Sequence, residues 1–134
     1  AAGCASGPLT SAEGNVNVTL PRAGETVTMT QQADGSWTGS IHTTGTARAF
    51  EATVSWQASF VSPSGTTISL GEGGFMTSAG APEFGTFDQL LTLVEPAGEP
   101  EPQGKGTLRI FIASMKDGSP QDIVDIPITL RAGQ

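Results

Sequence analysis

Hydrophobic and polar residues alternate most regularly between residues 50 and 60. Every second residue there is apolar, namely Phe50, Ala52, Val54, Trp56, Ala58 and Phe60. The residues between them are polar, namely Glu51, Thr53, Ser55, Gln57 and Ser59. A repeat of two residues predicts a long β-strand with one face on a core and the other in water. We expect this strand to extend from residue 48 to residue 61.

Shorter segments with the same repeat predict seven further strands. Their expected bounds are 15–20, 25–31, 36–43, 66–70, 86–94, 107–115 and 123–130. The segment 107–115 is apolar on both faces, which is typical of a central strand. A helical repeat of 3.6 residues does not continue for more than a turn or two anywhere in the chain.

Glycine- and proline-containing segments separate the expected strands. We expect residues 44–46 to end the strand 36–43 before the long strand begins. We expect residues 71–85 to form an irregular loop. The segment 95–106 is rich in Pro, Glu and Gly, so we expect an exposed connection. Residues 23–40 have the pattern of a hairpin around Trp37, with an Asp34-Gly35 turn.

These strands predict an all-β fold, an immunoglobulin-like β-sandwich of about seven to nine strands. The chain has 134 residues, enough for one domain, which we place at residues 15–134. The Cys–Trp–Cys pattern of antibody domains is absent, since Cys4 is the one cysteine of the sequence.

Charge narrows the classes of partner. The formal net charge is −7, and the six Lys and Arg residues are scattered, so no basic stripe could neutralise phosphates. We therefore expect no nucleic-acid partner and no electrostatic docking on an anionic membrane. We also expect the chain to be a monomer.

The N-terminus carries a possible lipid attachment site. Small residues precede Cys4 in Ala1-Ala2-Gly3-Cys4, as they do before the lipidated cysteine of bacterial lipoproteins, although Leu is usual where Ala1 stands. The small, polar residues 5–14 suit a flexible tether. We expect residues 1–14 to be a lipoprotein N-terminus that holds the domain at the outer face of the bacterial membrane, with the lipid as its membrane attachment.

Candidate catalytic and metal-binding residues are few. His42 is the single histidine, and strand parity places it on the outer face, away from Trp37 and Ile41. A catalytic triad or a zinc site would need more than this one imidazole and Cys4. We expect no enzymatic activity and no cofactor.

Two further groups of charged residues are candidate sites. Strand parity places Glu51 on the polar face of the long strand, near Arg48. We expect Glu51 either to form a surface ion pair or a hydrogen bond to a neighbouring turn, or to contact a partner together with Arg48. Asp117, Asp122 and Asp125 cluster around one turn and could supply oxygen ligands to calcium, although turn formation explains Asp117 and Gly118 more simply.

Five short motifs resemble a known family in their order along the chain. They are Gly45-Thr46-Ala47, Phe50-Glu51-Ala52, Gly85-Thr86-Phe87, the segment from Ser114 to Ser119, and the segment from Ile126 to Leu130. Over residues 39–130 the chain resembles the immunoglobulin-like domain of bacterial spore germination proteins. The resemblance implies a β-sandwich in an exported lipoprotein, without known catalytic residues.

The expected function is therefore a non-catalytic module of the cell envelope that contacts a protein or a wall polymer through a sheet face or its end loops. A link to sporulation or germination is implied by the resemblance. One alternative is a carbohydrate- or small-ligand-binding module, which exposed aromatic residues would favour. Another is a structural spacer for a neighbouring domain.

Overall fold

A computed structural model of the chain describes residues 9–11, 14–49, 52–80, 82–99, 101–113, 116–117 and 119–133. These residues form strands and turns, with no α-helix among them. The strands are β1 (Leu9–Thr10), β2 (Val16–Leu20), β3 (Glu25–Gln31), β4 (Trp37–Ala47), β5 (Thr53–Val61), β6 (Thr67–Met76), β7 (Gly85–Glu95), β8 (Gly104–Ala113) and β9 (Pro120–Gly133). The predicted all-β class is confirmed.

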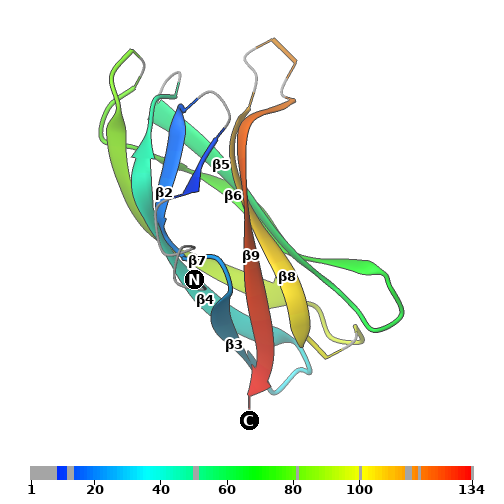
Figure 1. Ribbon diagram of the computed structural model, residues 1–134. Coiled ribbons are helices and arrows are strands. Elements are labelled where there is room, and N and C mark those ends of the chain that lie inside the picture. Colours follow the sequence, from blue (N-terminus) through cyan, green and yellow to red (C-terminus); the bar gives the residue numbers. More distant parts are fainter. Residues whose placement is uncertain are drawn as a thin grey trace, which may run out of the picture.

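One hydrogen-bonded network joins all nine strands, in the order β1-β2-β4-β3-β9-β8-β5-β6, with β7 paired to β4. Strands β3 and β9 are parallel, and the other pairs are antiparallel. Figure 1 shows β2 on one side of the molecule and β8 and β9 on the other. We call β1, β2, β4 and β7 the β4 half, and the other five strands the β9 half.

The two halves are joined through the expected hairpin around Trp37. Strands β3 and β4 pair only at Thr30 with Thr38 and at Gln31 with Trp37. Beyond this short ladder β4 continues with β2 and β7, whereas β3 continues with β9. This division into two halves is consistent with the predicted sandwich.

Residues that alternate along each strand build the core, as the two-residue repeat predicts. Val54, Trp56, Ala58 and Phe60 are all buried on β5, between more exposed polar neighbours. Inward residues of both halves form one hydrophobic cluster, which includes Val18, Met29, Ile41, Leu93, Leu108, Ile126 and Leu130. Each large side chain buried there stabilises the fold by about 1.5–3 kcal/mol. Phe50, at the start of the repeat, lies outside the described residues.

Strands β5 and β6 differ from the expected bounds. Ala52 has a φ of 57°, outside the strand region, and β5 begins at Thr53. Strand β6 extends to Met76, so the expectation of an irregular loop from residue 71 is wrong for its first part. The glycines there make room for Trp56, because a Cβ at Gly73 would lie 3.0 Å from the indole Nε1.

Strand β4 is continuous through residues 44–46, so the expected interruption is also wrong. Gly45 pairs with Phe87 on one side and with Val18 on the other. A Cβ at Gly45 would lie 2.1 Å from the carbonyl oxygen of Asn17 and 2.8 Å from a ring carbon of Phe87. Glycine at this position therefore permits a close approach of two backbones within the sheet.

Residues 9–11, which we expected in the tether, instead join the sheet. Leu9 and Thr10 pair with Val18 and Asn17, and Ser11 is buried. The Ser11 hydroxyl lies 3.4 Å from Asp122 Oδ1 at the start of β9. Cys4 lies outside the described residues. In the part of the chain that is described, no helix has the length and apolarity needed to cross a membrane.

Replacing Gly45 with alanine should destabilise the fold, because the new methyl group would overlap the Asn17 carbonyl group. We expect Gly45→Ala to lower the free energy of unfolding by about 1–3 kcal/mol in urea titrations. The neighbouring substitution Thr44→Ala, on the outer side of the same strand, should change it by less than about 0.5 kcal/mol. Equal stability of the two variants would contradict the close approach at Gly45.

Candidate functional site

Four polar residues stand in register across the outer face of the β9 half. Gln57 on β5 lies opposite Glu72 on β6 and opposite Arg109 on β8, and Arg109 lies opposite Asp125 on β9. We call Glu72, Gln57, Arg109 and Asp125 the polar row. Because cross-strand neighbours on one face lie about 4.5–5.5 Å apart, the row crosses four strands as a continuous polar surface.

Two of the three charged residues of the polar row pair with each other, and the third has no partner among the described residues. Arg109 donates two hydrogen bonds to Asp125, from Nε to Oδ1 at 2.7 Å and from Nη2 to Oδ2 at 3.1 Å. The hydrogen bond to Asp125 is the main reason that the pKa of Arg109 is raised above its ordinary value. At the other end of the row, Glu72 is exposed. Among the described residues, no hydrogen bond or ion pair involves its carboxylate.

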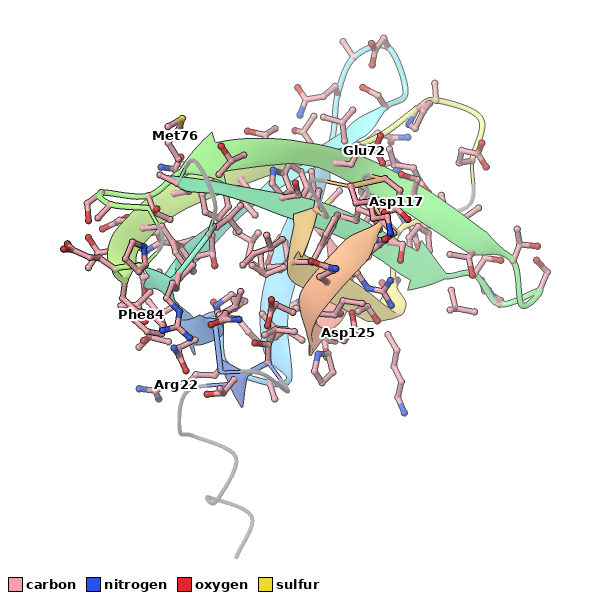
Figure 2. The ribbon with its side chains drawn as sticks, turned by 90° about the horizontal axis from the view of Figure 1, so that it is seen from above. Arg22, Glu72, Met76, Phe84, Asp117 and Asp125 are labelled. Carbon is pink, nitrogen blue, oxygen red and sulfur yellow. The ribbon has the colours of Figure 1, made fainter. Side chains whose placement is uncertain are left out.

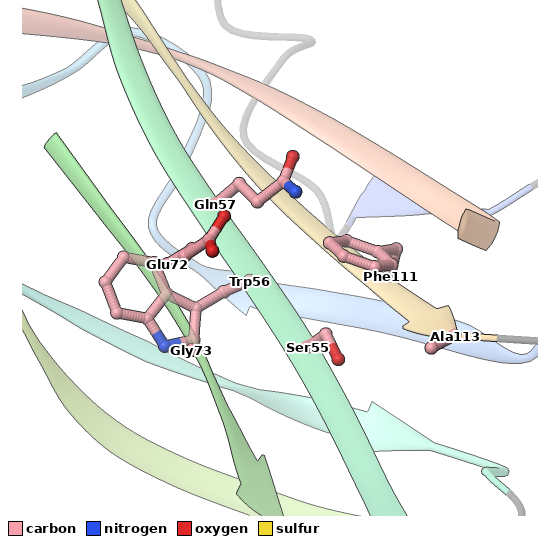
Figure 3. A pocket seen from close by; sticks show the side chains of 7 residues that line it. All are labelled: Ser55, Trp56, Gln57, Glu72, Gly73, Phe111 and Ala113. Atoms are coloured by element: carbon pink, nitrogen blue, oxygen red, sulfur yellow. The ribbon is translucent and has the colours of Figure 1, made fainter. Parts of the chain in front are cut away.

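Two adjoining depressions follow the polar row, and both include Gln57. The first has a volume of about 360 Å³ and is lined by Ser55, Trp56, Gln57, Glu72, Gly73, Phe111 and Ala113. The second has a volume of about 380 Å³ and is lined by Gln57, Ser59, Thr107, Arg109 and Asp125. Figure 3 shows Glu72 and Gln57 near each other on one side of the first depression, and Phe111 and Ala113 on the other. We call this first depression the Glu72 pocket.

Phe111 gives the Glu72 pocket its apolar wall. It follows Ile110 on β8 and therefore points to the opposite face from the core cluster, of which it is not a member. It is nevertheless only 6% exposed. The prediction of a segment that is apolar on both faces is therefore right only for the end of β8, where Phe111 and Ala113 follow the polar Thr107 and Arg109 on the outer face. The lining of the two depressions combines apolar side chains with a few polar and charged groups, a composition that suits ligand binding.

Arg48 lies at another place on the surface. Its guanidinium donates hydrogen bonds to Asn15 Oδ1, at 3.0 Å from Nε and 2.7 Å from Nη2. The same group lies over the ring of Phe84, 5.0 Å from the centroid, which is a cation–π contact. Glu51, its expected neighbour, lies outside the described residues. Figure 2 shows Phe84 far across the molecule from Glu72 and Asp125.

The three candidate calcium ligands each have a different partner. Asp117 Oδ1 accepts hydrogen bonds from the backbone amide and the hydroxyl of Ser119, as expected of a turn residue. Asp122 Oδ1 accepts a hydrogen bond from Asn15 Nδ2 at 3.2 Å, and Asp125 pairs with Arg109. No group of three possible metal ligands was found among the residues that the structure describes.

His42 is exposed, on the outer face, as strand parity predicts. Its Nε2 lies 2.5 Å from Asp88 Oδ1 on the neighbouring strand β7. This surface pair lies on the β4 half, away from the polar row.

The sequence of the chain was compared with known families. The model of the family described as the immunoglobulin-like domain of bacterial spore germination matches residues 15–119. The chain belongs to this family. The match begins earlier than the range in which the motifs recur and includes the whole β3–β4 hairpin. No curated protein matched the chain.

Membership agrees with the all-β architecture and with a non-catalytic module. Of the five motifs, Gly85-Thr86-Phe87 lies within the matched residues and begins β7, whereas Ile126 to Leu130 lies within β9, beyond residue 119 where the match ends. Phe50 and Glu51 of the second motif, and Ser114, Met115 and Gly118 of the fourth, lie outside the described residues.

Sequence reasoning did not identify Gln57, Glu72 or Arg109 as site residues. Strand parity places Gln57 and Arg109 on outer faces. Nothing in the sequence indicates, however, that two strands some fifty residues apart pair in the register that brings these two residues together. Glu72 fell in the segment expected to be a loop, so its place on β6 could not be foreseen. Asp125 was considered as a calcium ligand rather than as the partner of Arg109.

One buried carboxylate is unsatisfied. Glu95 ends β7 opposite Trp37, points inward, and has no exposed surface. Neither of its carboxylate oxygens has a hydrogen-bond partner in the described part of the chain. Burial is the main cause that raises the pKa of Glu95, and the charge of Glu99 adds to it. Folding therefore favours the protonated form of Glu95.

Glu95 should make the protein less stable as pH rises. Because its folded pKa is raised, its stabilising contribution is complete below the ordinary glutamate pKa of 4.5 and is lost as pH rises through the folded value. At pH 7.5, Glu95→Leu should raise the free energy of unfolding by about 1–3 kcal/mol, because it removes an unpaired buried polar group. Urea titrations at several pH values would measure this.

The matched control is Glu83→Leu, at an exposed position away from the causes of the Glu95 shift, which should change stability by less than about 0.5 kcal/mol. A stability difference between wild type and Glu95→Leu that is the same at pH 4 and at pH 7.5 would show that Glu95 does not titrate in this way.

Proposed function

We propose that the chain is an interaction module of the bacterial cell envelope that contacts a partner protein through the outer face of β6, β5, β8 and β9. The polar row carries this proposal. Four polar residues from distant parts of the sequence stand in register along two adjoining depressions. A rigid sheet holds them at fixed spacing, which is the arrangement that specific recognition needs.

A protein partner is favoured over a carbohydrate by the burial of the aromatic rings. Sugar-binding surfaces use exposed aromatic faces for stacking, but Trp37 is 7% exposed and Trp56 is 8% exposed. Phe111, within the Glu72 pocket, is 6% exposed. Phe84 is more exposed, at 46%, but Arg48 lies over its ring.

The proposed location rests on the N-terminus and the family. Ala1-Ala2-Gly3-Cys4 has the small residues that precede a lipidated cysteine, and the family is described as one of spore germination. We place the module at the outer face of the bacterial membrane, attached through a lipid on Cys4. In a spore-forming cell, its partner would belong to the germination machinery.

Site-specific cross-linking tests the contact face. A photo-reactive residue at position 57, in the full chain expressed in its native envelope, should cross-link one protein that mass spectrometry identifies. The same probe at Thr28, an exposed residue of β3, is the matched control and should not capture that protein. The purified partner should then bind the purified chain. Equal capture from both positions would contradict the proposed face.

Replacing Cys4 with serine tests the anchor. We expect Cys4→Ser to move the protein from the membrane fraction to the soluble fraction, because the sulfur that would carry the lipid is removed. Ser6→Ala should remain in the membrane fraction. Retention of Cys4→Ser in membranes would refute the lipid anchor and leave the cross-linking result unaffected.

A further inference from the structure

Glu72 is the one member of the polar row that presents a charge without a partner. Arg109, the cation of the row, is already engaged by both carboxylate oxygens of Asp125. Gln57 stands between Arg109 and Glu72 in the register. Among the described residues nothing neutralises Glu72, so its carboxylate is available to a cationic ligand.

The opposite wall of the Glu72 pocket is apolar. Figure 3 shows the Phe111 ring and the Ala113 methyl group across the depression from Glu72, with Ser55 between the two walls. A ligand that fits here needs an aliphatic part for this wall and a positive end for the carboxylate. Lysine combines a flexible four-carbon stem with a compact ammonium group.

The charge of the whole chain favours the same class of ligand. Its formal net charge is −7, so a basic segment of a partner is attracted over long distances and its approach is faster at low salt. The second depression continues from Gln57 towards Arg109 and Asp125, which provides donors and acceptors for an extended peptide backbone.

We propose that the Glu72 pocket receives a lysine side chain of the partner protein. This inference rests on the proposed function, because it names the chemistry of the partner at the proposed face. The ammonium group pairs with Glu72, and the Gln57 amide bonds to the neighbouring peptide group. The stem packs against the exposed Ala113 and against the small exposed part of the Phe111 ring, a contact that suits a narrow alkyl chain better than a sugar ring. The glycan of a wall polymer lacks the ammonium group that this pocket selects.

Peptide titration of the purified, folded chain tests the pocket. The probe is a capped tripeptide, Gly-Lys-Gly, followed by amide chemical shifts of β5, β6 and β8 in NMR spectra. We expect saturable shifts centred on Gln57 and Glu72, with a Kd of roughly 1 mM for so small a ligand. Tripeptides with norleucine or acetyl-lysine in place of lysine should cause no saturable shift, because they lack the charge.

Two variants separate the role of Glu72 from general electrostatics. Glu72→Gln should weaken binding of the lysine peptide by about tenfold, because the charge-assisted hydrogen bond is lost. Glu25→Gln makes the same change of charge at an exposed position on β3 and should change the Kd by less than about twofold. Thermal melting of both variants would show that each remains folded.

The outcomes are distinct. Equal weakening by both variants, or equal binding of the norleucine peptide, would overturn the lysine pocket. Tighter binding of a cell-wall stem peptide with a free amine than of the lysine peptide would overturn the assignment of the lysine to a partner protein, since the ligand would then be the wall. Lysine binding without a cross-linked partner in the envelope would support the pocket while refuting the proposed function.

Discussion

The hydrogen bonding of β4 on both sides is the constraint on which the rest of the molecule depends. Along one edge β4 pairs with β7 over its full length, and along the other it pairs first with β3 and then with β2. Through β3 it is connected to β9 and thereby to the face that carries the polar row. Gly45 permits this double pairing, because a side chain there would meet the Asn17 backbone.

Much of the fold was predictable because burial imposes a simple rule on each strand. Where one face is dry, apolar residues must recur at every second position, and Val54 to Phe60 or Val124 to Leu130 show this in the sequence itself. Close approaches between two parts of the chain produce no repeating pattern in the sequence. Gly45 and Gly73 look like breaks in the sequence, but in the sheet each makes room for another part of the chain.

The candidate site was less predictable than the core for a related reason. A core residue is recognisable from its own strand, whereas the polar row exists only through the register of β6, β5, β8 and β9. The two-residue repeat requires only that outer residues be polar. Gln57 and Arg109 therefore could not be distinguished in the sequence from the other polar residues on outer faces. Glu95 was expected in the exposed connection 95–106, because a carboxylate at the end of an apolar strand is normally solvated, but it ends β7 and is buried.

The position of β9 has a mechanical consequence. This last strand lies between parallel β3 and antiparallel β8, with ladders on both of its edges. A force that pulls on β9 along its axis must shear both ladders together, whereas a force on an edge strand can unzip its bonds one after another. A load applied to the end of β9 is therefore distributed over the β9 half, and the register of the polar row is kept while the chain is under tension.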